Sequence, residues 1–341
     1  MSAAIPISTP NQIPRKILLK FVMLLMALLV ASGSLFFAES AFASAALDNA
    51  PVERASVLQG HRWIHGSSDC EVNADPEIDV YAHDQTTYIL RQNKCLTFEA
   101  PFIYVLVGDS KILVLDTGDL DAAAGFSLYE NVRSILGHEI LKGKEILVVH
   151  SHSHGDHQRG DAQFEGKPGV TIVKPTGDDV RRFFDFSQWP DGLASIDLGG
   201  RVLAVIPTPG HQEEAITIYD PQTKWLLTGD SLYPGYIYVK NLVAYKSSIE
   251  RLLRFSETNA VSAILGAHIE MKRDSNEYYP IGSTFQPEEA VLDLAPNSLR
   301  KLNNRLQEAN GKDELVFDTF IVKPMNVFQK SLSNFARWIT S

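Results

Sequence analysis

Cysteine is scarce in this chain, and basic side chains are outnumbered by acidic ones. Two cysteines occur in 341 residues, and 31 Lys plus Arg stand against 41 Asp plus Glu, which gives a formal net charge of −10. A protein this acidic is a poor partner for phosphate backbones. The chain also has no cluster of Lys and Arg that would form a basic groove. We therefore expect no nucleic-acid partner.

Internal repeats and low-complexity linkers are also missing from the sequence. Their absence excludes a repeat architecture and gives no sign of a flexible tether between domains. The remaining composition, 45% apolar and 21% charged, is typical of a globular protein with a sizeable core. A length of 341 residues fits one large domain or two small ones.

The two cysteines, Cys70 and Cys95, flank two segments of alternating polarity at residues 78–83 and 87–92. Such a pattern predicts a β-hairpin closed at its base. Outside the cytosol a pair of this kind is expected to form a disulfide. The alternative, a thiol that binds a metal, fails on position because neither cysteine lies near the histidine-rich part of the sequence.

The N-terminus has the order of segments found in secretory signals. Three basic residues precede an uncharged, mostly apolar stretch at 21–38, and the small-x-small site Ala41-Phe42-Ala43 follows. The alternative is an uncleaved anchor, since 18 residues can just span a bilayer. Ser32, Gly33 and Ser34 weaken that alternative, and no cysteine near the site supports a bacterial lipoprotein. We expect a cleaved signal at residues 1–43 and a periplasmic or secreted protein.

Apolar patterns predict helices and strands that mix along the rest of the chain. Helical spacing occurs at residues 122–136, 245–255 and 297–309. Short β-type runs occur at 102–107, 112–115, 145–149, 170–173, 202–206, 215–219, 225–228, 263–265 and 315–322. This mixture indicates the α/β or α+β class with a mixed sheet.

The most informative segment is residues 152–157, which read His-Ser-His-Gly-Asp-His directly after an apolar run at 146–149. It offers four candidate metal ligands, which are His152, His154, Asp156 and His157. A strand that ends in this way delivers them to the carboxyl edge of a sheet, where active sites of α/β proteins lie. Imidazole and carboxylate suit zinc, and also iron or manganese. The alternative is a polar surface loop that is rich in histidine.

Further ligands should come from the ends of other strands, because neighbouring side chains of one loop point apart. His211, Asp230 and His268 each follow a strand-like run, and each has a glycine within the two preceding residues that allows a tight turn. Taken singly, each is a weak signal, because a lone His or Asp at a strand end is more often a cap or a surface residue. Together with residues 152–157 they form one constellation.

This constellation resembles the metallo-β-lactamase superfamily, over roughly residues 98–268. The resemblance rests on the H-x-H-x-D-H string and on the later His, Asp and His in family order. It implies an α/β (α+β) fold, a four-layer αββα sandwich of two mixed β-sheets with outer helices. It divides the chain into a signal at 1–43, N-terminal strands with a hairpin at 44–97, the core at 98–285, and a C-terminal extension packed on the core at 286–341.

The resemblance also assigns ligands for two metal ions per chain, expected to be Zn²⁺, with iron or manganese as alternatives. His152, His154 and His211 would hold one ion, Asp156, His157 and His268 the other, and Asp230 would bridge both. Asp116, in a strand-ending Asp-Thr-Gly, would orient a ligand from the second shell. His150 is not used as a ligand in the family, so we expect it to be buried support. His61, His65, His83 and His138 lie outside the cluster.

The implied reaction is hydrolysis of a small-molecule ester, lactone, thioester or amide. A hydroxide held between the two metals would attack the carbonyl, and either Asp156 or a metal-bound water would supply the proton to the leaving group. Tyr233 is the candidate oxyanion donor, with aromatic packing at the sheet edge as its alternative role. Tyr236, Tyr238 and Lys240 follow on what we expect to be the same loop, as candidate substrate contacts.

At two places the sequence differs from particular branches of the superfamily, and each difference argues against one class of substrate. Asp230 stands where true β-lactamases usually have Cys or Ser, which argues against a β-lactam substrate. Residues 231–235 read Ser-Leu-Tyr-Pro-Gly, where thioesterases of the glyoxalase II type have a Cys-Gly-Arg-like stretch, so glutathione recognition is in doubt. A metallo-β-lactamase and a non-catalytic metal-binding partner protein remain the alternatives. Residues 278–289 would either roof the site or cover the sheet.

Overall fold

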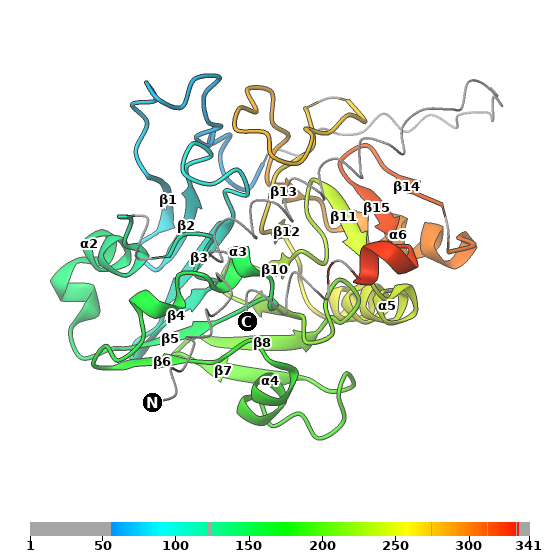
Figure 1. Ribbon diagram of the computed structural model, residues 1–341. Coiled ribbons are helices and arrows are strands. Elements are labelled where there is room, and N and C mark those ends of the chain that lie inside the picture. Colours follow the sequence, from blue (N-terminus) through cyan, green and yellow to red (C-terminus); the bar gives the residue numbers. More distant parts are fainter. Residues whose placement is uncertain (1–55, 122–124, 274, 312, 332, 334–341) are drawn as a thin grey trace, which may run out of the picture. The chain divides into compact units, whose positions relative to one another are not determined.

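The computed structural model describes residues 56–121, 125–273, 275–311, 313–331 and 333 (Figure 1). The predicted signal at 1–43 lies outside these described residues. In the part of the chain that the structure describes, no helix combines the length and the apolar character needed to cross a membrane.

The first sheet contains six strands in the order β1-β2-β3-β4-β5-β6. Its strands are β1 (Ile78–Asp84), β2 (Thr87–Gln92), β3 (Phe102–Val107), β4 (Lys111–Leu115), β5 (Glu145–Val149) and β6 (Val170–Ile172). The first four pair antiparallel through short connections, whereas β4, β5 and β6 pair parallel. A parallel pair needs a crossover, and helix α2 (Leu128–Leu141) provides it between β4 and β5.

The second sheet also has six strands, in the order β13-β12-β10-β9-β8-β7. Its strands are β7 (Ala194–Asp197), β8 (Val202–Pro207), β9 (Ile216–Asp220), β10 (Trp225–Gly229), β12 (Ala263–Gly266) and β13 (Asp293–Leu294). Helix α5 (Leu242–Thr258) connects the parallel strands β10 and β12. A third, three-stranded sheet holds β11 (Tyr236–Val239), β15 (Ile321–Pro324) and β14 (Leu315–Val316).

Successive side chains of a strand point to opposite faces of its sheet, and most of the buried apolar side chains form three separate cores. In β4, Leu113 and Leu115 belong to the core between the two large sheets, whereas Ile112 and Val114 face the outer core that α2 covers. Strand residues point alternately to opposite faces, so a strand buried on both sides reads as a continuous apolar run.

The second sheet is covered in the same way. Leu226 of β10 lies in a third core with Ile249 and Leu252 of α5 and Leu302 of α6 (Asn297–Glu308). The order of layers is therefore helix, sheet, sheet, helix, as expected from the resemblance (Figure 1).

Several elements differ from the sequence-based expectations. The helix expected at 122–136 is α2 at Leu128–Leu141. The single strand expected at 315–322 is two short strands, because the chain turns back where Phe317 N donates to Phe320 O at 3.0 Å. Strands β7, β11 and β13 were not predicted. Each has four residues or fewer, too short for a periodic pattern to stand out.

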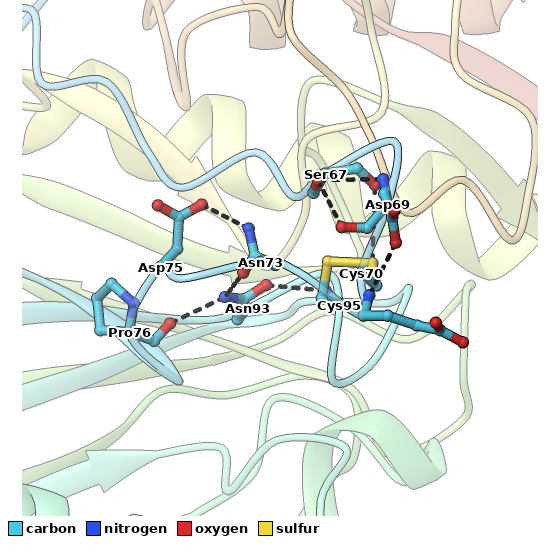
Figure 2. The surroundings of a disulfide bond; sticks show 9 residues. Ser67, Asp69, Cys70, Asn73, Asp75, Pro76, Asn93 and Cys95 are labelled. Atoms are coloured by element: carbon cyan, nitrogen blue, oxygen red, sulfur yellow. Dashed lines mark hydrogen bonds between the residues drawn. A yellow bond between two sulfur atoms is a disulfide. The ribbon is translucent and has the colours of Figure 1, made fainter.

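The predicted disulfide between Cys70 and Cys95 is confirmed, and it closes the base of the antiparallel β1–β2 hairpin (Figure 2). Asn93, beside it, accepts a hydrogen bond from Cys95 N at 2.8 Å. The amide of Asn93 also donates to Asn73 Oδ1 at 3.0 Å and to Pro76 O at 2.9 Å. The turn after β2 is thus joined to the segment before β1 by one covalent bond, two hydrogen bonds from the Asn93 side chain and one from Asn93 N to Glu77 O at 3.0 Å.

Candidate metal centre

Four strand ends meet at one edge of the two large sheets. Strands β8, β10 and β12 run in one direction, because β9 is antiparallel to both β8 and β10 while β12 is parallel to β10. Their carboxyl ends lead to His211, Asp230 and His268. From the other sheet, the loop after β5 carries residues 152–157 and enters the short helix α3 (Gly155–Gln158). Ile216 N donates to Ser151 O at 2.9 Å, which ties this loop to the second sheet.

The structure brings all seven predicted ligands together, in two groups. The first group is His152, His154, His211 and Asp230, and the second is Asp156, His157 and His268. Within each group the candidate donor atoms all lie within 4.8 Å of one another.

Asp230 faces both groups with different oxygens. Its Oδ2 lies 3.6 Å from His152 Nε2 and 3.4 Å from His211 Nε2. Its Oδ1 lies 3.5 Å from the Nε2 atoms of both His157 and His268. One carboxylate is therefore placed between the two sets of imidazoles, as a bridging ligand requires.

The donor set fits metal ions better than it fits hydrogen bonding. Among the described residues, His152 Nε2, His157 Nε2 and Asp230 Oδ1 are buried without a hydrogen-bond partner. Buried polar atoms normally have partners, so these three need another explanation. In a tetrahedral centre with bonds of about 2.0–2.1 Å, ligand atoms lie about 3.3–3.4 Å apart. The separations of 3.2–3.6 Å around Asp230 and Asp156 match that spacing.

The two groups differ in the direction in which their surroundings shift the pKa values of their histidines. Burial and the neighbouring imidazoles lower the pKa of His152 well below its usual value and that of His154 to about 3. In the second group burial also disfavours charge, but the carboxylates of Asp230 and Asp156 raise the pKa of His268 to about 9. Two carboxylates and two imidazoles share this small buried volume, where a bound cation would balance the negative charge.

Asp116, at the end of β4, is hydrogen-bonded to one of the ligand candidates, and its role in orienting a metal ligand stays a prediction. Its Oδ2 accepts a hydrogen bond from His157 Nδ1 at 2.9 Å and another from Ser151 Oγ at 2.9 Å, while Oδ1 accepts from Ser151 N at 2.7 Å. Because Nδ1 of His157 donates, its Nε2 is the atom left for a metal. His150 is buried as expected, between Asp161 Oδ1 at 2.8 Å and Val173 O at 3.0 Å.

Two further ligand candidates donate hydrogen bonds to backbone carbonyls, which the sequence did not reveal. His211 Nδ1 donates to Tyr238 O at 2.7 Å, and His268 Nδ1 donates to Glu99 O at 3.1 Å. A carbonyl is present at every residue, so no residue type marks these partners in advance. Glu214, also missed, accepts from Ser153 N at 3.0 Å and supports the loop between two ligands.

Two glycines beside the ligands are required by close backbone approach. Gly210, with φ 151°, lies so near Tyr245 that an added Cβ would be 2.6 Å from its Cα. Gly229, with φ 50°, would place a Cβ 2.5 Å from Ser151 Cβ. Both positions allow the ligand loops to pack directly against neighbouring elements.

Tyr233, the predicted oxyanion donor, lies beside the second group, with its ring centroid 5.6 Å from that of His268. Its hydroxyl faces Tyr236 O and Glu270 Oε2, each at 3.2 Å. Burial and the Glu270 carboxylate raise the pKa of Tyr233 well above its usual value. The hydroxyl proton thus holds the loop after β10 to Glu270, and the oxyanion role stays a prediction.

Of the loop expected to carry Tyr236, Tyr238 and Lys240, the two tyrosines lie in strand β11, which pairs with β15, and Lys240 follows the end of that strand. The expectation was wrong because its partner comes from the distant C-terminal part of the chain. The Tyr236 hydroxyl donates to Glu314, and Lys240 Nζ lies 3.2 Å from Glu213 Oε1. Contact with substrate stays a prediction for these side chains.

Comparison with known proteins gives a consistent set of similarities. The family model of the metallo-beta-lactamase superfamily matches residues 96–268. The hydroxyacylglutathione hydrolase of Anaeromyxobacter dehalogenans is 29% identical over 135 residues, 39% of this chain and 46% of that protein. The acyl-coenzyme A thioesterase MBLAC2 of Homo sapiens is 31% identical over 249 residues, 60% of this chain and 88% of that protein. The chain therefore spans about half of the first relative and most of the second.

Among solved structures, a metallo-beta-lactamase from Pontibacter korlensis is matched over 68% of this chain and 100% of its own length. The sequence identity is 15% and the TM-score is 0.45.

Proposed function

The chain belongs to the metallo-beta-lactamase superfamily, and from this premise we propose that it is an exported hydrolase that uses two divalent metal ions. One observation carries the proposal. Asp230 presents Oδ2 to His152 and His211, and Oδ1 to His157 and His268, at separations of 3.4–3.6 Å. A carboxylate between two sets of imidazoles is suited to bridging two ions. Zinc is the metal that this ligand set fits first, with iron and manganese as alternatives.

In the proposed reaction, the bound ions and the side chains of this protein would have different roles. Two bound divalent ions lower the pKa of water and polarise a carbonyl oxygen. His152, His154 and His211 would hold one ion, Asp156, His157 and His268 the other, and Asp230 both. We propose Asp156 as the carboxyl group of this chain that would move a proton to the leaving group. Asp116 keeps His157 in the tautomer that leaves Nε2 open.

A thioester is the first substrate to test. The names of two relatives describe action on hydroxyacylglutathione and acyl-coenzyme A. The segment Ser-Leu-Tyr-Pro-Gly at 231–235 argues against glutathione as the leaving group, so other thioesters rank ahead of it. Esters, lactones and amides present the same kind of carbonyl and belong in the same panel.

Export is part of the proposal. It rests on the charged, apolar and small segments of residues 1–43, which the structure does not describe. The disulfide between Cys70 and Cys95 supports it, because such bonds persist in oxidising compartments. Fractionation of the native host, followed by N-terminal sequencing of the purified protein, would test the compartment and the cleavage site. A cytosolic protein with an intact N-terminus would refute this part.

The function is tested by measuring hydrolysis of thioesters, esters, lactones and β-lactams by the purified protein, before and after chelation and readdition of zinc. We expect thioester hydrolysis that chelation abolishes and zinc restores. Asp230→Ala should abolish it, whereas Asp318→Ala, which changes an exposed aspartate, should not. Preferred turnover of β-lactams would identify a metallo-β-lactamase instead. Metal binding with no turnover of any substrate would indicate a non-catalytic partner protein.

A further inference from the structure

The turn between β2 and β3, residues 93–99, is held from outside by the disulfide. Cys95 lies within it and is bonded to Cys70, in a segment without regular secondary structure (Figure 2). Inside the turn, Asn93 O accepts from Leu96 N at 2.9 Å and from Thr97 N at 3.2 Å. The buried Lys94 closes it by donating from Nζ to Phe98 O at 2.8 Å. We call residues 93–99 the clamped turn.

The end of the clamped turn contacts a metal-ligand candidate directly. Glu99 O accepts the hydrogen bond from His268 Nδ1 at 3.1 Å. This bond fixes the ring so that Nε2 faces Asp156 Oδ2 at 3.2 Å and Asp230 Oδ1 at 3.5 Å. The backbone hydrogen bond from Phe102 N to Ala267 O, at 2.8 Å, continues the same contact into β3. The orientation of His268 therefore depends on where the turn lies.

The middle of the clamped turn is linked, through two intermediate side chains, to the helix that carries the other two members of the second group. Thr97 Oγ1 donates to the Asp119 carboxylate, which also forms an ion pair with Arg159. Arg159 directly follows α3, the helix that carries Asp156 and His157. Arg159 Nη1 donates to Asp119 O at 3.1 Å as well. One turn thus braces both the helix and the strand end that supply the second group.

The first group is oriented by other parts of the chain. His211 Nδ1 donates to Tyr238 O at 2.7 Å, in strand β11. His152 Nδ1 lies 3.1 Å from Ser151 Oγ. His154 is hydrogen-bonded to Gln212 beside His211. These partners lie after β5, after β8 and in β11, so displacement of the clamped turn would leave them in place.

We propose that the Cys70–Cys95 disulfide is a positioning element for the second metal group. This role rests on the proposed function, in which Asp156, His157 and His268 hold an ion. Without the disulfide, the clamped turn keeps its internal hydrogen bonds but loses its covalent tie to the outer segment. The carbonyl of Glu99 then becomes less fixed, and His268 loses the partner that aims its Nε2. Partners of this kind typically change metal affinity about 10–100-fold.

Metal loading of the second group would therefore depend on whether the compartment is oxidising or reducing. A thiol reductant, itself oxidised to a disulfide, would convert Cys70 and Cys95 to two thiols with transfer of two electrons and two protons. The second group would then hold its ion weakly while the first group stays loaded. Full loading would require an oxidising compartment, which agrees with the proposed export.

The test compares zinc binding by the wild type and by the double variant Cys70→Ser/Cys95→Ser, by equilibrium competition with a chromophoric chelator. The wild type should show two binding steps. In the double variant one step should weaken by about 10–100-fold while the other step stays in place. Thr97→Val, which keeps the disulfide but removes the hydroxyl bound to Asp119, should shift the same step. Its near-isosteric side chain keeps the proposal testable if the double variant does not fold.

Val132→Ala is the matched control, because Val132 is fully buried on α2 and away from the turn. It lowers stability without touching either group, so both binding steps should be unchanged. If the double variant binds both ions as the wild type does, the disulfide is not a positioning element. If both steps weaken equally, the effect is general loosening and the proposal is also wrong. A wild type that binds fewer than two ions refutes the proposed function instead.

Discussion

Substitution of Asp116 by Asn should weaken the second metal group while leaving the shape of the site intact. Asp116 is 1% exposed, and its carboxylate accepts three hydrogen bonds, two from Ser151 and one from His157 Nδ1. An asparagine can keep its oxygen toward Ser151 N. Its NH₂ group would then face the Nδ1–H of His157, so a donor meets a donor there, whereas the Ser151 hydroxyl can rotate to accept from the NH₂ group.

The magnitude follows from this mismatch. His157 can relieve it by moving its proton to Nε2, the atom that would bind the metal, or by donating to Ser151 Oγ, which lies 3.3 Å from Nδ1. Loss of such a partner typically costs about 10–100-fold in metal affinity, which is about 1.4–2.8 kcal/mol. In the metal-free protein, each donor left buried without a partner costs about 1–3 kcal/mol of folding free energy. We therefore expect both weaker binding at one group and a measurable loss of stability in the metal-free state.

The assay is chelator competition for zinc together with urea unfolding of the metal-free protein. Asp116→Asn should shift one of the two binding steps and lower the unfolding midpoint. Asp318→Asn, on an exposed aspartate, is the matched control and should change neither. Two unshifted binding steps in Asp116→Asn would show that Asp116 does not orient His157, and the reasoning from its hydrogen bonds would be refuted.

Three further substitutions test the fold and the first group. Arg201→Met leaves the buried Asp220 carboxylate without its ion pair, formed at 2.6 Å, and should cost about 3–5 kcal/mol at pH 7 in urea unfolding. Burial alone would raise the pKa of Asp220, but Arg201 and Thr223 lower it below its usual value. Stability from this pair is therefore present above about pH 4, the usual Asp pKa, and lost as pH falls through the folded value, so the two proteins should converge in acid. Leu302→Ala, at a fully buried position of α6, should cost about 2–5 kcal/mol in the same assay. Gly210→Ala would force a Cβ to within 2.6 Å of a neighbouring Cα, and should cost about 1–3 kcal/mol and lower the zinc affinity of the first group.

Each of these three predictions would be contradicted by a specific result. A constant difference between Arg201→Met and the wild type from pH 7 to pH 3 would show that Asp220 does not titrate with the pair. Less than about 0.5 kcal/mol for Leu302→Ala would place α6 outside the core, since that is the range of surface substitutions. Unchanged zinc binding by Gly210→Ala would show that the backbone there does not set the position of the adjacent ligand.

The clustering of the seven ligand candidates could be predicted from the sequence because each is marked by residue type and by its place after an apolar run. His152, His154, Asp156 and His157 lie in one string, and His211, Asp230 and His268 each end a strand. A strand end fixes where a side chain emerges, so seven local patterns were enough to predict one site. The αββα layers followed from the same strands through the family resemblance.

The partners that aim the ligands could not be predicted in the same way. Glu99 and Tyr238 act through backbone carbonyls, which no side chain identifies. The pairing of β11 with β15 joins residues 85 positions apart, such as Tyr236 and Ile321, and neither strand exceeds four residues. Such contacts depend on how whole layers pack, and a periodic pattern within one segment carries no information about them.

The disulfide was predictable as a bond but not as part of the site. Cys70 and Cys95 flank the β1–β2 hairpin in sequence, which indicated their pairing. Their relation to His268 passes through residues 93–99 and the carbonyl of Glu99, and it emerges only when β12 is seen to end beside that turn.

The most direct measurement of the central claim is the metal content of the purified protein, determined by elemental analysis with protein concentration from amino-acid analysis. The account predicts two divalent ions per chain in the wild type, and fewer in Asp230→Ala because both groups share that carboxylate. A wild type that holds no more than one ion after full exposure to zinc, iron and manganese would contradict the account.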